Sequence, residues 1–302
     1  NSAALLAHLY AWKGSMIELY GLSGANAQEA YRKSIDYSSI LINGQAGSYS
    51  LVSSPEELCK LLSNPAANNP EEIFSLVYDK TRSNTAVTHN EVASHFCTWP
   101  VDKTKTLGDI TTTPFRLFAS TVKALYPDAS DTRRTSFFYE ADETHEVDGK
   151  DYAIPYKFRN AIFANDASSS SGLSFTSVDA NYVYWRLADI YLLRAECYAK
   201  LGETGNATSD LNKIRERAGA TAYPASGESD LKEAIFHERE REFVLENDSR
   251  YYDILRDAET NGIVLDGHDV SAATRAQFRA DLPEFHPELL TAEIRRQTDN
   301  NA

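Results

Sequence analysis

The stretch from Val183 to Arg256 constrains the fold most, because nearly all of it has the residue spacing of α-helices. In its first part, apolar residues recur at alternating steps of three and four, which places them on one helix face. These residues are Trp185, Ala188, Leu192, Ala195 and Ala199, and the face is widened by Leu187, Tyr191, Tyr198 and Leu201. Because other helices must cover a helix with so broad an apolar face, the sequence predicts a mostly α fold.

A second helix is predicted after a short break. Gly202 marks the end of the first helix, since glycine adopts the left-handed conformation at a helix C-terminus without steric cost. Asn206 is a suitable N-cap for the helix that follows. Two antiparallel helices within about 36 residues have the size of a tetratricopeptide unit. Residues 183–220 are therefore predicted to form a tetratricopeptide-like helical hairpin.

A similar hairpin is predicted over residues 1–45. Ser2–Tyr20 carries an apolar stripe that includes Trp12, and Asn26 is expected to cap the second helix. Beside the apolar stripe runs a stripe of small residues, Ala3, Ala7 and Ala11. An internal repeat of a helical hairpin is typical of helical-repeat scaffolds. Because Trp12 and Trp185 lie on helix stripes, we expect both to be buried in the core.

The third helical segment, from Leu231 to Arg256, is rich in charged residues. Some of them alternate with residues that should be buried, and we predict that these form a partly buried ion network between this segment and the first helix. The predicted network consists of Arg239, Glu242, Arg250 and Asp253. Glu240 and Arg241 are expected on a solvated face. A catalytic carboxylate pair is the alternative, but the flanking residues suggest no nucleophile, metal-spaced histidine or open cleft.

Between the hairpins, residues 79–182 are predicted to be irregular and loop-rich. Periodicity disappears from Asp79 to about Pro114, where Thr, Ser and Asn are frequent. A helix is predicted from Phe115 to Tyr126, and another after Ser54, whose side chain and the following proline favour a helix start. Glu72–Tyr78 alternates like a strand.

Composition excludes several classes of protein. The chain has 302 residues and a net charge of −14, which argues against a nucleic-acid partner, because binding to phosphates depends on Lys and Arg. No apolar run approaches the length of a membrane span. Cys59, Cys97 and Cys197 are far apart and show no CxxC spacing, so we expect neither a disulfide framework nor a metal site. No cofactor motif is present.

Three segments together resemble the SusD/RagB family. They are YWRLADIYLLRAE (184–196), LNKIRERAG (211–219) and HERER…RYYDILR (237–256), in the order and at the spacing of that family. The resemblance covers most of the chain. It implies a single SusD-like domain over residues 1–302, with a C-terminal portion at 228–302 and a loop-rich, ligand-facing segment at 79–182. The family's long N-terminal portion and its lipidated cysteine are not found, so we expect a shortened form.

The resemblance also implies a function. Members of the SusD/RagB family are outer-membrane lipoproteins at the cell surface that bind oligosaccharide or polysaccharide. They cap a TonB-dependent, SusC-like transporter that imports the glycan, and they are not enzymes.

Neutral sugars need exposed aromatic platforms, so we looked for aromatic residues in the loop-rich segment. The candidate glycan-binding residues are Trp99, Phe96, Tyr139 and Tyr156. Trp99 is the strongest, since a large aromatic residue in a polar loop has no periodic reason to be there. The alternatives are a helical-repeat scaffold that binds a protein partner without a small ligand, and a glycoside hydrolase with two carboxylates.

Overall fold

The computed structural model divides the chain into two compact units, Asn1–Arg256 and Asp257–Ala302. It describes residues 1–20, 22–77, 91–96, 115–168, 172–246, 249–261, 264–265 and 268–269. In the second unit, the described part comprises the end of α10 (Ser249–Asn261) and the antiparallel pair β9 (Val264–Leu265) and β10 (His268–Asp269). The assignment of residues 1–302 to one domain stays a prediction.

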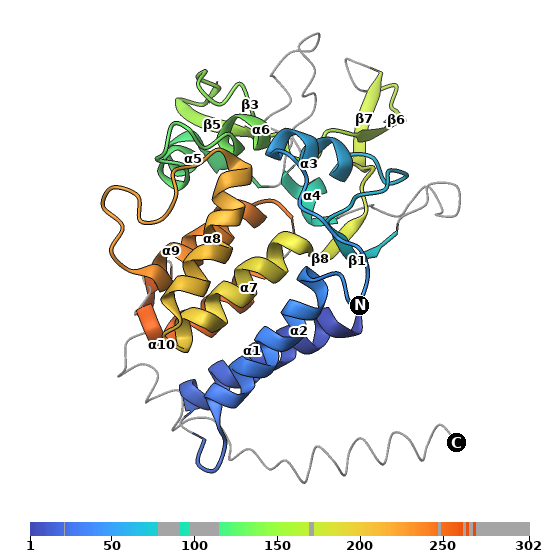
Figure 1. Cartoon of the computed structure of the whole chain (residues 1–302). Helices are drawn as coiled ribbons and strands as arrows, with labels where there is room; N and C mark the ends of the chain where they lie inside the picture. Colours follow the sequence, from blue (N-terminus) through green and yellow to red (C-terminus); the bar gives the residue numbers. More distant parts are fainter. Residues whose placement is uncertain are drawn as a thin grey trace. The chain divides into compact units, whose positions relative to one another are not determined.

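Two helical hairpins pack side by side in the first unit (Figure 1). They are α1 (Ser2–Tyr20) with α2 (Ala27–Ile42), and α7 (Leu187–Lys200) with α8 (Thr204–Ala218). Contacts between α2 and α7 join the hairpins, and α9 (Leu231–Phe243) packs against α7 and α8. The prediction of a mostly α fold with tetratricopeptide-like hairpins is confirmed.

Small residues form the seam of the first hairpin, as predicted. Ala7 and Ala11 are fully buried, and Ser34 donates a hydrogen bond to the Ala7 carbonyl oxygen at 2.8 Å. Gly14 lies so close to Tyr31 that a Cβ atom at this position would come within 2.5 Å of the Tyr31 ring. The two helices can approach this closely only because these side chains are short or absent.

The predicted helix caps are confirmed in part. The Asn26 side chain accepts a hydrogen bond from the Glu29 amide, and Gly202 has φ +76°. The prediction for Asn206 was wrong, because α8 already begins at Thr204. Its side chain instead donates to the Glu203 carboxylate at 3.0 Å.

The residues just before α7 form a strand and not the first turn of the helix. This strand, β8 (Tyr182–Arg186), pairs antiparallel with β1 (Glu72–Leu76), which lies in the region where alternation predicts a strand. Trp185 fits both the three-and-four spacing of α7 and the alternation of β8. The apolar pattern alone therefore does not show where the strand ends and the helix begins. The aromatic and β-branched residues of β8 favour the pleated conformation, and α7 starts only at Leu187.

The charged third segment forms two helices instead of one. The first, α9, ends at Phe243, and the backbone at Leu245 is left-handed, with φ +68°. The Lys157 ammonium group donates to the carbonyl oxygens of Glu242 and Val244, at 2.8 and 3.0 Å. These two carbonyl groups therefore bond to a side chain at the point where the helix stops.

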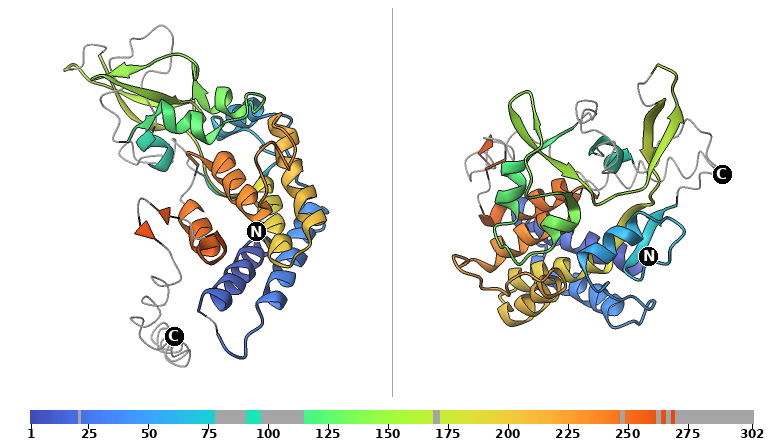
Figure 2. Two further views of the ribbon diagram at one scale, coloured as in Figure 1. Left: turned by 90° about the vertical axis from the view of Figure 1, so that its left-hand side faces the viewer. Right: turned by 90° about the horizontal axis from the view of Figure 1, so that it is seen from above.

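The segment between the hairpins contains several short strands. A sheet consists of β2 (Leu117–Phe118), β5 (Lys150–Pro155) and β3 (Phe138–Tyr139), with β4 (Glu146–Val147) also paired to β5, and β6 (Ala161–Asn165) pairs with β7 (Leu173–Val178). Short helices in this part of the unit are α3 (Pro55–Leu62), α4 (Glu91–Phe96), α5 (Ala119–Leu125) and α6 (Arg133–Phe137). The helix predicted from Phe115 thus begins later, after β2. Figure 2 shows these strands together at one end of the helical hairpins.

Candidate functional site

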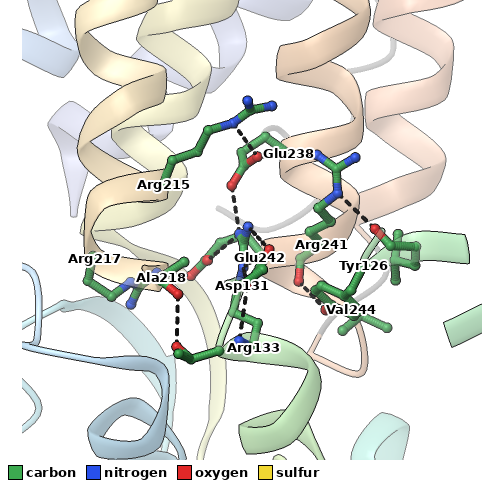
Figure 3. Close-up of polar contacts among 12 residues, drawn as sticks. Tyr126, Asp131, Arg133, Arg215, Arg217, Ala218, Glu238, Arg241, Glu242 and Val244 are labelled. Atoms are coloured by element: carbon green, nitrogen blue, oxygen red, sulfur yellow. Dashed lines mark hydrogen bonds and ion pairs between the residues drawn. The ribbon is translucent and has the colours of Figure 1, made fainter. Parts of the chain in front are cut away.

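A buried lattice of ion pairs joins α9 to the rest of the first unit. Glu242, which is fully buried, pairs with Arg133 on α6, Arg186 at the end of β8 and Arg217 on α8. Figure 3 shows Arg133, Arg217 and Glu242 between the helices, together with Glu238. The predicted burial of Glu242 in an ion network is confirmed, and the network reaches more elements than the first helix alone.

Arg239 forms a second part of this lattice. Its guanidinium group pairs with Asp189 on α7 at 2.8 Å and with Asp253 on α10 at 2.9 Å. Asp253 also pairs with Arg256, and all four residues are buried. The predicted link between the charged segment and the first helix is therefore confirmed for Arg239 and Asp253.

Two predictions about this segment were wrong. Arg250 does not reach α7, and instead bonds to Glu240 at 2.8 Å and lies 3.7 Å from the centre of the Phe236 ring, both on α9. Arg241 is not on a solvated face, since its Nε donates to the Leu125 carbonyl oxygen at 2.8 Å. Sequence spacing alone does not show that α5 covers this side of α9.

The lattice keeps the carboxylates of Glu242 and Glu246 ionised. Burial raises the pKa of Glu242, but the surrounding guanidinium groups, Arg217 first, lower it more, so the pKa lies below its ordinary value. The pKa of Glu246 is also lowered, because Arg186 and Lys157 outweigh the effect of burial. A carboxyl group that stays ionised in this way is a poor general acid.

Two of the four candidate glycan-binding residues lie together, Tyr139 on β3 and Tyr156 directly after the end of β5. The rings of Tyr139 and Tyr156 are 5.4 Å apart and meet edge to face, and both side chains are partly exposed. Arg159 lies 4.1 Å from the centre of the Tyr156 ring, and Glu56 holds its guanidinium group through two bonds of 2.7 Å. The orientation of Tyr156 is thus fixed by its neighbours.

Of the other two candidates, the structure describes only Phe96, which does not join this pair. Phe96 lies on α4, half-buried against the core cluster that contains Val122 and Phe138, with its ring 5.6 Å from that of Phe115. Trp99 falls outside the described residues.

A second aromatic pair lies near the other end of β5. Phe118 on β2 is paired in register with Tyr152 on β5, and their rings stack 5.3 Å apart. The Phe118 side chain is 46% exposed. Sequence analysis missed this pair, because it depends on the register between β2 and β5. One aromatic pair thus lies near each end of β5, Phe118 with Tyr152 near its start and Tyr139 with Tyr156 near its end.

A hollow of about 620 Å³, here called the aromatic hollow, opens between α1, β8 and α10. Its walls include Leu9 and Trp12 from α1, Tyr184 and Trp185 from β8, and Tyr252 from α10. Trp12 is only partly buried and belongs to no core cluster among the described residues, so the prediction that it is a core residue was wrong. Trp185 is also partly buried, but it packs against the core cluster that contains Leu41 and Ile190. An apolar stripe on a helix faces the core only if another element covers it, and the described residues leave this side of α1 open.

Part of the buried ion lattice forms the floor of the aromatic hollow. Asp189, Arg239, Asp253 and Arg256 all line it, and His8 bonds to Asp189 at 2.6 Å. The His8 ring stacks on Trp185 with centroids 5.6 Å apart. Aromatic walls above a charged, hydrogen-bonded floor are suited to a ligand that has both apolar faces and hydroxyl groups.

The cysteines provide no reactive site in the described part of the chain. Cys59 and Cys197 are fully buried and not in a disulfide bond, and burial raises the pKa of each thiol to about 12. Cys97 lies outside the described residues. Where residues are described, no cluster of three or more His, Cys, Asp or Glu side chains is arranged to hold a metal ion, and no helix is long and apolar enough to cross a bilayer.

Comparison with known proteins shows what the chain is similar to. The SusD-like protein P25 of Formosa agariphila is 36% identical over 122 residues, which are 39% of this chain and 21% of that protein. A SusD homologue from Bacteroides thetaiotaomicron superposes with a TM-score of 0.60 at 23% identity, covering 85% of this chain and 50% of the other. NanU of Bacteroides fragilis superposes with a TM-score of 0.56 at 21% identity, over 94% and 61% of the two chains.

The match to P25 concerns the sequence, and the two structural matches concern the fold. The chain spans about half the length of the first of these structural relatives and about a fifth of P25. The SusD family profile matches residues 24–280, which include both α7–α8 and the charged segment of α9 and α10. The chain belongs to the SusD family.

Proposed function

We propose that this protein binds oligosaccharide or polysaccharide at the cell surface and passes it to a TonB-dependent, SusC-like transporter of the outer membrane. The observation that carries the proposal is the placement of partly exposed aromatic rings along β5, in a chain that belongs to the SusD family. Aromatic faces bind the C–H faces of sugar rings, and a fixed ring loses little conformational entropy on binding.

The proposed contact residues are Tyr139, Tyr156 and Phe118 on the sheet, with Trp99 and Phe96 from the adjoining segment. Tyr156 is the residue best prepared for binding, since Arg159 and Tyr139 hold its ring in one orientation. The ion lattice under the sheet supports this role, because Arg133 and Lys157 anchor the ends of α6 and β5 to α9.

The proposal includes a binding role without catalysis. A glycoside hydrolase needs one carboxyl group that can donate a proton and a second one across an open cleft. Glu238, Glu242 and Glu246 are buried, and each is paired with an arginine. This arrangement supports a rigid frame for binding.

Affinity electrophoresis through gels that contain different polysaccharides tests the proposal. At least one glycan should retard the parent protein, and the Tyr156→Ala variant should be retarded less. Tyr37→Ala is the matched control, since Tyr37 is also a partly buried tyrosine in a stacked pair, with Tyr10, but lies on α2. Equal retardation of all three proteins would contradict a role for Tyr156, and no retardation in any gel would contradict glycan binding.

A protein-binding scaffold is the second candidate, and one observation favours it. Leu5 and Leu9, which lie on the side of α1 that lines the aromatic hollow, are 45% and 51% exposed and form an apolar surface suited to a protein partner. A scaffold without a small ligand would show no retardation in any glycan gel. The same experiment therefore separates the two candidates.

A further inference from the structure

We propose that the aromatic hollow is a second saccharide-binding site, which takes a neutral pyranose residue. This inference rests on the proposed function, but it concerns a different surface from the aromatic pairs along β5. The hollow lies among α1, β8 and α10, and its volume of about 620 Å³ is in the range of small-ligand sites.

The walls of the hollow offer aromatic surface on two sides. On one side, the rings of Trp12 and Tyr252 meet edge to face with centroids 5.7 Å apart. On the other, Trp185 stacks on His8 and lies next to Tyr184, which is 40% exposed. Two aromatic walls can contact both C–H faces of a sugar ring.

Polar groups without a protein partner distinguish this hollow from an apolar docking groove. Within the described part of the chain, the indole N–H groups of Trp12 and Trp185 form no hydrogen bond. Arg239 and Arg256 both pair with Oδ1 of Asp253, and its Oδ2 has no partner among the described residues. Two donors and one acceptor therefore remain for a ligand. Sugar hydroxyl groups can both donate and accept, whereas an apolar helix would leave these groups unpaired.

The charges of the floor indicate a neutral sugar. Asp189 and Asp253 are each paired with Arg239, and Asp253 is also paired with Arg256. Arg256 is held in addition by Glu196 at 2.9 Å. Because each charged group of the floor already has a partner of opposite charge, an anionic or cationic ligand would have to compete with a buried ion pair.

Titration with defined glycans tests the proposal. The probes are the hexasaccharides of maltose, cellulose, xylan and laminarin type, with hexagalacturonate as the acidic counterpart. Binding is followed by calorimetry and by tryptophan emission, because two of the three tryptophans line the hollow. One neutral probe should bind the parent protein and change its emission, and hexagalacturonate should not change it.

Two variants and a matched control locate the binding site. Tyr252→Ala should weaken neutral-glycan binding about tenfold, because one stacking wall is lost. Trp12→Phe keeps an aromatic ring but removes the indole N–H group, and should weaken binding about fivefold. Tyr37→Ala is the control, since Tyr37 is a partly buried tyrosine on α2 that stacks with Tyr10 and does not line the hollow. Its affinity should equal that of the parent.

The possible outcomes separate this inference from the proposed function. Parent-like affinity in both Tyr252→Ala and Trp12→Phe, with loss in Tyr156→Ala, overturns the hollow as a site and leaves the sheet as the glycan-binding surface. Binding of hexagalacturonate alone overturns the assignment of a neutral sugar. If no probe binds the folded parent protein, both proposals are contradicted.

Discussion

Arg239 on α9 pairs with Asp189 on α7 at 2.8 Å, and both side chains are buried. The same guanidinium group also pairs with Asp253 on α10, so a single side chain holds three helices in register. Burial alone would raise the pKa of Asp189, but the charges of His8 and Arg239 lower it by more than that. The pKa therefore lies below its ordinary value, and the carboxylate stays ionised. These ion pairs link α7, in the second hairpin, to α9 and α10, and their residues form the floor of the aromatic hollow.

Removing this guanidinium group should destabilise the protein strongly. Arg239→Ala removes the guanidinium group that Asp189 and Asp253 share and leaves these buried carboxylates with only His8 and Arg256 as partners, and we expect a loss of about 3–5 kcal/mol in the free energy of unfolding. Arg239→Lys should lose less, although one ammonium group cannot reproduce the forked contacts to Asp189 and Asp253. Urea denaturation measures both. Arg134→Ala, which breaks a pair with the exposed Asp142, is the control and should cost less than about 1 kcal/mol.

The lattice should also make stability dependent on pH on the acid side. The folded-state pKa of Glu242 lies below its ordinary value of 4.5, so its contribution is present above that value and is lost as the pH falls towards the folded-state pKa. The free energy of unfolding should therefore decrease as the pH falls below about 5. Glu242→Gln should reduce this slope, whereas Glu57→Gln, at an exposed pair with Lys60, should not. An unchanged slope in Glu242→Gln would be inconsistent with the lowered pKa.

Close helix packing at Gly14 gives a prediction that is independent of function. Gly14→Ala forces a Cβ atom against the Tyr31 ring, and we expect a loss of about 1–3 kcal/mol in stability. Gly205, on α8, has open space around its Cα atom, so Gly205→Ala should stabilise the protein by up to about 1 kcal/mol. Thermal denaturation of both variants distinguishes a steric effect from a general effect of replacing a helical glycine. Equal changes in melting temperature for Gly14→Ala and Gly205→Ala would show that the first hairpin is packed more loosely around Gly14 than the contact with Tyr31 indicates.

Trp99→Ala should weaken glycan binding and leave the melting temperature nearly unchanged. A large aromatic residue in a polar loop adds contact area for a sugar ring, and its removal should lower affinity about tenfold. Calorimetric titration and thermal denaturation of the same samples provide both readouts. A large loss of stability with unchanged affinity would place Trp99 in the core.

Local patterns predicted the helices well because helix formation depends on neighbouring residues. The spacing of Ala188 and Leu192, the cap at Asn26 and the glycine at 202 each depend on local sequence, and the structure confirms them. The burial of Arg239 was also predictable, since it lies four residues from both Ile235 and Phe243 and therefore on their helix face. The strand β8 was not, because its partner β1 lies far away in the sequence.

The candidate sites were harder to predict than the helices. The pairing register between β2 and β5 places Phe118 opposite Tyr152, and this register cannot be predicted from local sequence patterns. Trp12 was assigned to the core because it lies on an apolar stripe, but a stripe does not show which elements cover it. The tertiary arrangement of α1, β8 and α10 leaves it beside the aromatic hollow. Tyr139 and Tyr156 were proposed as binding residues because they are aromatic residues of the loop-rich segment. That their rings are in contact is evident only from the fold.

Calorimetric titration of the folded parent protein with a panel of neutral and acidic glycans measures whether this chain binds sugars. We expect saturable heat with at least one glycan, weakened in Tyr156→Ala and unchanged in Tyr37→Ala. Absence of binding to every glycan by protein with its native melting transition would contradict this expectation.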